Sequence, residues 1–289
     1  MKKRTGFVSN SSSSSFVTAW PKKPKTIDAM NTMLFGDSKE YANPYPWEDR
    51  PDCFHVDAVS EWLMKYLKWS KKDVRESLVE DLNGEVYCLI RELGEGRTNC
   101  STFVGDKIVS CLVLYRKQAK DYLALLKKRF PRVKWQARFD AAIANRAKWH
   151  KLHEAENKKE WDLIKKLRVE HDCPELPWVD TKEMTAEQKA AYEKLRKESW
   201  DSYETLVTND PRCVAQRKRM QSIWRREREN AKTLETIDLA ANRLADIFME
   251  DNAGCVFSQI EIHDDSEFGS ALEHGDLFSK LPHMKFSHH

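Results

Sequence analysis

The sequence predicts an α+β or α/β fold in which a small sheet, formed from both chain ends, is interrupted by a long antiparallel helical arm. Two observations predict this arrangement. Strand-like segments occur near each end, at residues 16–20 and 256–262, and residues 134–171 between them contain neither proline nor glycine. An uninterrupted segment of that length favours one long helix. We therefore expect a core domain of residues 1–133 and 254–289, with residues 134–253 inserted as a helical hairpin or three-helix arm.

The first predicted elements are a strand and a helix. Residues 16–20 are β-branched and aromatic and end before Pro21, which is typical of a short strand. Thr26 is a suitable N-cap for a helix that ends at Gly36. Residues 37–55 are rich in proline and aromatic side chains and are expected to form an ordered loop.

Two amphipathic helices follow, predicted by apolar residues at helical spacing. These residues are Val59, Leu63, Met64 and Leu67 in the first helix, and Val74, Leu78 and Leu82 in the second. The apolar residues 86–90, which follow Asn83-Gly84, predict a strand buried on both faces. Residues 108–114 either pair with that strand or begin the helix that runs to Phe130.

The arm is expected to contain several helices. At 1.5 Å per residue, a helix over residues 134–171 would be about 55 Å long, more than a compact core can bury. Residues 173–178 contain two prolines and must form a bend. Helices are predicted to restart at the capping box of residues 185–188 and at Asp210-Pro211, and the last helix is expected to include residues 220–248.

Charge is unevenly distributed along the 289 residues, which carry a formal net charge of +3. Residues 116–250 hold 31 basic and 23 acidic residues, whereas residues 251–289 hold 2 and 7. The seven cysteines form no C-x-x-C pair, which fits reduced thiols in the cytoplasm. The basic N-terminus is followed by serines rather than by an apolar run, and no segment approaches about 20 apolar residues. We therefore expect no secretory signal and no membrane partner.

The N-terminal serine run is a candidate ligand site, because hydroxyl groups and backbone amides can hold a phosphate group. The run lacks the glycines and the lysine of a phosphate-binding loop, so a solvated low-complexity tail is the alternative. Apolar residues on both sides, Phe7-Val8 and Phe16-Val17, favour an ordered segment. The predicted phosphate-binding residues are Asn10, Ser11, Ser12, Ser13, Ser14 and Ser15.

The C-terminal segment is rich in histidine and carboxylates. Imidazole with carboxylate suits zinc, manganese or iron, and a histidine beside an aspartate also suits general base catalysis. The candidate catalytic residues are His263, Asp265, Glu273 and His274. The candidate metal ligands are His263, Asp265, His274 and His288, so a divalent metal is the candidate cofactor. Chance clustering is the alternative, because the chain contains nine histidines.

A basic segment with interleaved aromatic residues lies in the arm and suits the backbone of a nucleic acid. Its cations are Arg217, Lys218, Arg219, Arg225 and Arg226. The alternative is an exposed helix whose charges form i,i+4 pairs, with an apolar stripe for self-association or partner docking. His150 and His153 lie among lysines and arginines and are expected on a solvated helix face.

Both chain ends resemble a set of mostly uncharacterised proteins from bacteriophages and bacteria. The N-terminal similarity covers residues 4–17, with the string GFVSNSSSSSF, and residues 21–36. The C-terminal similarity covers DDSxFGSxxEHG, which begins at Asp264, and the ending Ser287-His288-His289. The resemblance implies a phage or mobile-element origin and carries no assigned chemistry.

Two functions follow from these features. The first is a phage-encoded hydrolase-like or ligand-binding protein, in which the serine run holds a phosphate-bearing ligand beside a metal or proton-transfer site. The second is a noncatalytic interaction protein, virion-associated or regulatory, that uses the arm to assemble or to bind nucleic acid. The expected location is the cytoplasm of an infected bacterium or the virion. The candidate partners are a second copy of the chain, a host or phage protein, and nucleic acid.

Overall fold

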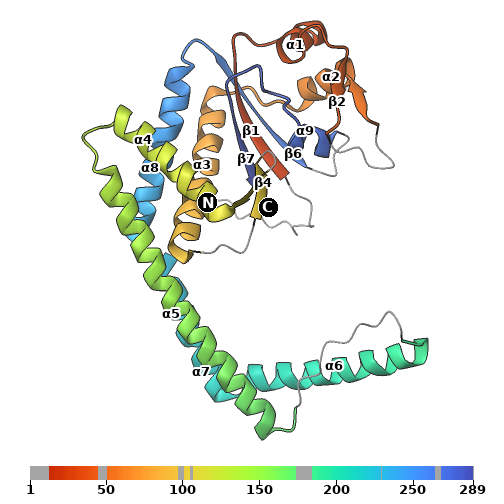
Figure 1. The fold of residues 1–289 in the computed structure, drawn as a ribbon, viewed down its shortest axis with the longest axis vertical. Coiled ribbons are helices and arrows are strands. Elements are labelled where there is room, and N and C mark those ends of the chain that lie inside the picture. The colour runs from red at the N-terminus through yellow and green to blue at the C-terminus, as the bar shows by residue number, and fades with distance from the viewer. Residues whose placement is uncertain are drawn as a thin grey trace. The chain divides into compact units, whose positions relative to one another are not determined.

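The structure is a computed structural model that describes residues 13–44, 51–96, 101–104, 107–173, 184–228, 230–263 and 268–288. It is an α+β protein with the predicted small antiparallel sheet built from both ends of the chain (Figure 1). The described residues divide into two compact units. The first unit comprises residues 1–89, 118–135 and 237–289, and the second comprises residues 90–117 and 136–236. Relative to the predicted boundaries, residues 90–117 fall in the unit that contains the arm, and residues 237–253 fall in the first unit.

The sheet of the first unit has β1 (Ser13–Trp20) at its centre, between β6 (Val256–His263) and β7 (His283–His288). Both neighbours are antiparallel to β1, and Ser13 lies opposite His263 on one side and opposite His288 on the other. The predicted strands at residues 16–20 and 256–262 are therefore confirmed, and the two chain ends are adjoining strands. Residues 14–20 are all buried, because both faces of the central strand are covered.

One face of the sheet packs against α1 (Ile27–Leu34), α2 (Val56–Tyr66) and α9 (Gly269–His274) (Figure 1). Phe16, Trp20 and Ile260 project from this face into a continuous apolar core. Burial of large aromatic and aliphatic side chains is the main stabilising contribution of such a core. Thr26 caps α1 as predicted, since its hydroxyl accepts a 3.2 Å hydrogen bond from the Ala29 amide.

The opposite face packs against α3 (Lys71–Glu95) and α8 (Ala231–Asp251). Phe257 of β6 contacts Phe248 of α8, with ring centroids 6.1 Å apart, and Gln259 donates a hydrogen bond to the Ser77 hydroxyl of α3. α4 (Cys111–Arg129) joins this layer through Arg129, which forms ion pairs with Glu250 and Asp251. The sheet is therefore the middle layer of the first unit.

Residues 86–90 are helical, so the predicted strand is wrong. They belong to α3, in which Leu82, Val86 and Leu89 are buried at helical spacing while Tyr87 is 45% exposed. Gly84, which precedes the predicted strand in the sequence, lies inside this helix, and a side chain there would meet open space. Glycine inside a helix costs about 1 kcal/mol relative to alanine, which the packing of the apolar stripe offsets.

The described residues also contain two short antiparallel strand pairs. β2 (Glu40–Ala42) pairs antiparallel with β3 (Cys53–His55) inside the expected loop of residues 37–55. Residues 45–50 of that loop lie outside the described residues. β4 (Ser101–Val104) pairs with β5 (Lys107–Ser110), and α4 begins directly afterwards. Residues 108–114 thus both pair as a strand and begin a helix, and their partner strand is β4.

The second unit contains α5 (Trp135–Glu170), α6 (Ala186–Asn209) and α7 (Pro211–Arg228). The predicted long helix is confirmed as α5. The predicted capping box is also present, since the Thr185 amide donates to the Gln188 side chain at 3.0 Å and the Gln188 amide donates to the Thr185 hydroxyl at 3.2 Å. Residues 174–183, which contain most of the predicted bend, lie outside the described residues.

The predicted last helix is two helices, α7 and α8. Asp210 caps α7 as predicted, because its carboxylate accepts a 2.7 Å hydrogen bond from the Arg212 amide. Asn230 caps α8 in the same way, with a 3.2 Å bond from the Thr233 amide to its side chain. This second cap interrupts the helical pattern that the apolar residues suggested. α7 runs antiparallel to α5 and lies beside it (Figure 1).

Candidate functional site

The sheet brings together the two chain ends that the sequence singles out. Ser13 is flanked by His263 and His288 in the neighbouring strands. The last serine residues of the run and part of the histidine cluster therefore lie at the same end of the three strands. Three of the predicted ligand residues, Asn10, Ser11 and Ser12, lie outside the described residues. This juxtaposition is one of backbone register.

Ser14 and Ser15 are buried on opposite faces of the sheet. The Ser14 hydroxyl donates a 3.0 Å hydrogen bond to the Glu273 carboxylate of α9, and Ser15 donates a 2.6 Å bond to the Asp81 carboxylate of α3. Ser14, Ser15 and Glu273 are 0%, 3% and 1% exposed. These hydroxyls therefore join the central strand to helices on both sides, and none of the three residues is open to a ligand.

The predicted metal and catalytic residues are only partly described. His263 is exposed at the end of β6 and His274 is exposed at the end of α9, whereas Glu273 points into the core. Asp265 and the side chain of His288 lie outside the part of the chain that the structure describes. Within the described residues, no three His, Cys, Asp or Glu side chains are grouped so that they could hold a metal ion. The metal site stays a prediction.

Lys285 and Tyr41 are two neighbours of this region that sequence reasoning did not identify. The Lys285 ammonium donates to the main-chain carbonyl of Glu273 and lies 5.5 Å from the centre of the Phe16 ring. Desolvation lowers the pKa of Lys285, against the charges of nearby carboxylates, which raise it. The Tyr41 hydroxyl donates a 3.2 Å bond to the Ala271 carbonyl, and a Cβ at Gly275 would overlap that hydroxyl. Glu273 and Gly275 of the EHG string thus have structural roles.

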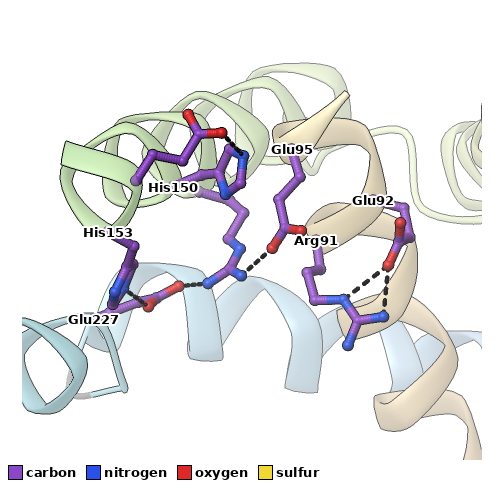
Figure 2. Close-up of polar contacts among 8 residues, drawn as sticks. Arg91, Glu92, Glu95, His150, His153 and Glu227 are labelled. Carbon is purple, nitrogen blue, oxygen red and sulfur yellow. Dashed lines mark hydrogen bonds and ion pairs between the residues drawn. The ribbon is translucent and has the colours of Figure 1, made fainter. Parts of the chain in front are cut away.

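The second unit holds a buried cluster of charged side chains (Figure 2). The Arg146 guanidinium of α5 forms ion pairs with Glu95 of α3 and with Glu227 of α7, so both carboxylates point toward it from different helices. His153, two turns further along α5, contacts the other oxygen of Glu227 through Nε2 at 2.7 Å. The side chains of Glu95 and His153 are only 2% and 12% exposed. The expectation that His150 and His153 lie on a solvated face is therefore wrong.

Burial lowers the pKa of His153 from its ordinary value near 6.5, and the charges of Arg146 and His150 lower it further. The opposing contribution comes from the Glu95 carboxylate, which raises it. His153 Nδ1 is buried without a hydrogen-bond partner among the described residues. A protonated imidazole would need an acceptor there, so the neutral form, with Nε2–H donating to Glu227, fits this cluster best. The cluster therefore connects α5 and α7 with the last turn of α3.

A basic face lies on one side of the α5–α7 pair. Lys159 of α5 and Arg219 of α7 both reach Glu156, at 2.6 Å and 4.0 Å. Lys166 and Arg212 both reach Glu170, at 4.0 Å and 2.9 Å. Cations from two helices that share a carboxylate must lie on the same side of the pair. Hydrogen bonds from Lys159 and Arg212 lower the pKa values of Glu156 and Glu170, respectively, so both carboxylates are ionised at neutral pH.

Further exposed cations lie on α7, and two of them, Lys218 and Arg225, lie about 100° around the helix from Arg219 and Arg226, on the outer side of α7. Lys218 and Arg219 lie seven residues before Arg225 and Arg226, and seven residues are almost two helical turns. All four are exposed, and Lys218, Arg225 and Arg226 have no ion-pair partner among the described residues. We use "basic face" for the following set: Lys159, Lys166, Arg212, Lys218, Arg219, Arg225 and Arg226.

Arg217, which the sequence grouped with these cations, does not belong to the basic face. Its guanidinium donates to the Val207 carbonyl in the last turn of α6, and its side chain is half-buried. A cation at that position satisfies a carbonyl that the helix leaves without an amide partner. Arg212, Lys159 and Lys166 belong to the face instead. The seven-residue step from Arg212 to Arg219 was the signal in the sequence that could have identified Arg212, whereas no such signal links Lys159 and Lys166 to α7.

α7 differs from the other two helices of the arm in its charge pattern. It contains six arginines and one lysine, and its one acidic residue, Glu227, points into the buried cluster. In α5 and α6, acidic residues alternate with basic ones. The outer side of α7 therefore carries positive charge that its own helix does not neutralise.

Known protein families, curated proteins and solved structures give no match to this chain. Of the helices in the described part of the chain, none is both long and apolar enough to cross a membrane.

Proposed function

We propose that this chain is a noncatalytic interaction protein that binds nucleic acid through the basic face of the α5–α7 pair. The observation that carries the proposal is the exposure of Lys218, Arg225 and Arg226 on a helix whose single acidic residue is turned inward. Such cations release counterions from a phosphate backbone when they bind it, which is the main source of affinity in sequence-independent recognition.

Nucleic acid fits this face better than an acidic protein does. From Arg212 to Arg226, α7 presents its cations over about 21 Å in regular steps of seven residues. A phosphate backbone offers charge at regular intervals over any such length, whereas the carboxylates of a folded protein are irregularly spaced. Arginine also binds phosphate oxygens through two parallel N–H groups, and four of the seven cations are arginine.

The test is a titration of a fluorescent oligonucleotide with the full chain at 50 mM salt, followed by anisotropy. The variant Lys218→Gln, Arg225→Gln, Arg226→Gln removes three exposed charges without touching a described ion pair. We expect it to weaken binding by about tenfold or more. Poly-glutamate of equal charge is expected to compete poorly.

The matched control is Lys189→Gln, Lys194→Gln, Lys197→Gln, which removes three exposed charges from α6 in the same unit. It should leave the affinity within about twofold of the parent value, since these lysines lie among the acidic residues of α6. The proposal is wrong if the chain does not bind at 50 mM salt, if both variants weaken binding equally, or if poly-glutamate competes as well as the oligonucleotide.

A second candidate function is favoured by the register of the sheet, in which Ser13 lies between His263 and His288. We propose as the alternative that this end of the sheet binds a divalent metal or a phosphate-bearing ligand for hydrolysis. Of the predicted catalytic residues and metal ligands, His263 and His274 are described and exposed. Elemental analysis after incubation with zinc or manganese should show metal in the parent chain and less in His263→Ala and His274→Ala. Near-zero metal in all three chains would contradict the metal form of this alternative.

The similarity of both ends to phage and bacterial proteins supports a phage-encoded origin as part of these proposals. It also supports a location in an infected bacterium or on a virion. Assembly with a second copy of the chain, or with a host or phage protein, is a further role that the exposed arm permits.

A further inference from the structure

The basic face has two parallel rows of cations. Lys159 and Lys166 form one row on α5, and Arg212, Arg219 and Arg226 form the other on α7. Successive members of each row are seven residues apart, which is about 10 Å along a helix axis. Packed helices lie about 8–10 Å apart, so the rows are separated by a similar distance. Glu156 and Glu170 lie between the rows and hold them in register.

Two rows of cations match two rows of phosphates. The minor groove of B-form DNA is about 6 Å wide, and a sugar-phosphate backbone runs along each of its edges. Flexible lysine and arginine stems can span the difference between that width and the separation of the rows. A single strand has one row of phosphates and about half the charge per unit length, so it can engage one row of cations at a time.

The basic face also lacks the groups that single-strand binders use. Such proteins stack bases on aromatic side chains. The exposed tryptophans of this pair lie off the two rows: Trp161 is two residues, or about 200°, around α5 from Lys159, and Trp224 is two residues, or about 200°, around α7 from Arg226. Trp224 is 47% exposed and packs beside the His153 ring, 6.1 Å between centroids.

We infer that the partner is a double-stranded nucleic acid, held across its two phosphate backbones without reading of the bases. This inference rests on the proposed function and narrows it to one class of ligand. It requires cations from both helices, whereas binding of a single strand would need α7 alone.

The experiment compares a 20-base-pair DNA duplex with one of its strands, at 50 mM salt, for the full chain and two variants. The parent chain should bind the duplex about tenfold or more tightly than the strand. Lys159→Gln, Lys166→Gln removes the α5 row and should reduce this preference to about threefold or less. The control, Lys158→Gln, Lys165→Gln, removes two exposed lysines about 100° further round the same helix and should keep the preference of the parent.

The outcomes separate the two proposals. Absence of binding to either DNA by the parent chain overturns the proposed function and, with it, this inference. Equal or tighter binding of the single strand overturns the duplex inference alone. The same holds if both lysine pairs change the preference equally. Circular dichroism of each variant verifies that its helix content equals that of the parent chain, so that a loss of preference reports the missing charges.

Discussion

The Ser14 hydroxyl donates a 3.0 Å hydrogen bond to the Glu273 carboxylate, and both side chains are buried although 259 positions separate them in the sequence. The bond connects the central strand of the sheet to α9. Ser14 was predicted to bind a ligand and Glu273 to take part in catalysis. Their hydrogen bond gives both residues a structural role instead. The free-energy cost of burying a carboxylate is low only when hydrogen-bond donors surround it.

Ser14→Ala should therefore destabilise the protein by about 1–3 kcal/mol, because it removes a donor from a buried carboxylate. Urea unfolding measures the loss. In a chain that already carries Glu273→Gln, the same alanine substitution should cost less, since a neutral amide tolerates the missing donor better. Equal losses in the two backgrounds, or a loss below about 0.5 kcal/mol, would show that the pair is not coupled.

Gly275→Ala should also destabilise the first unit. A methyl group there overlaps the Tyr41 hydroxyl and approaches the Ala271 carbonyl, so the segment must shift. Overpacking of this kind typically costs about 1–3 kcal/mol. Adding Tyr41→Phe removes the hydroxyl and should recover part of the lost thermal stability. An unchanged melting temperature for the single variant would contradict the close approach.

Stability should fall at acidic pH through His153. Its pKa is lowered in the folded state, so the unfolded chain takes up a proton near pH 6.5 that the folded chain accepts only at lower pH. The contribution of His153 to the free energy of unfolding is therefore complete above about pH 6.5 and decreases as the pH falls below that value. The slope contributed by one histidine is at most about 1.4 kcal/mol per pH unit.

His153→Gln should flatten this part of the profile between about pH 7 and pH 5, because glutamine does not titrate. His55→Gln is a suitable comparison, since His55 is exposed on the first unit. A profile that keeps its slope in His153→Gln would mean that other groups cause the acid sensitivity.

Arg217→Gln and Arg219→Gln should differ although the residues are two positions apart. Arg217 donates to the Val207 carbonyl, so its loss should weaken the join between α6 and α7 and leave nucleic-acid affinity nearly unchanged. Arg219 lies on the basic face, and its loss should lower the dependence of binding on salt by about one counterion. Anisotropy at several salt concentrations distinguishes them. Equal effects on binding would show that Arg217 contacts the nucleic acid as Arg219 does, and would contradict a purely structural role for Arg217.

The periodicity of apolar residues and the helix-capping residues predicted much of the fold. The strand at residues 16–20, the Thr26 cap, the long helix α5 and the capping box at Thr185 are all present, because each depends on local backbone chemistry. The pairing of the chain ends also followed from apolar strands at both termini. The strand predicted at residues 86–90 failed because a short apolar run does not distinguish a buried strand from one side of a helix.

The candidate sites were harder to predict. Composition identified α7 as basic. However, the exclusion of Arg217 from the basic face and the inclusion of Lys159, Lys166 and Arg212 in it depend on how helices distant in sequence pack. His153 illustrates the same limit. Its neighbours in sequence are lysines and arginines, whereas its neighbours in space are Glu227 and Arg146.

The salt dependence of DNA binding tests the central claim most directly. A plot of the logarithm of the association constant against the logarithm of salt concentration has a slope set by the number of phosphates that cations neutralise. The variant Lys218→Gln, Arg225→Gln, Arg226→Gln should have a slope smaller in magnitude by about three than the parent chain. Identical slopes for the two chains would show that these cations do not contact phosphate and would contradict the basic face as the binding surface.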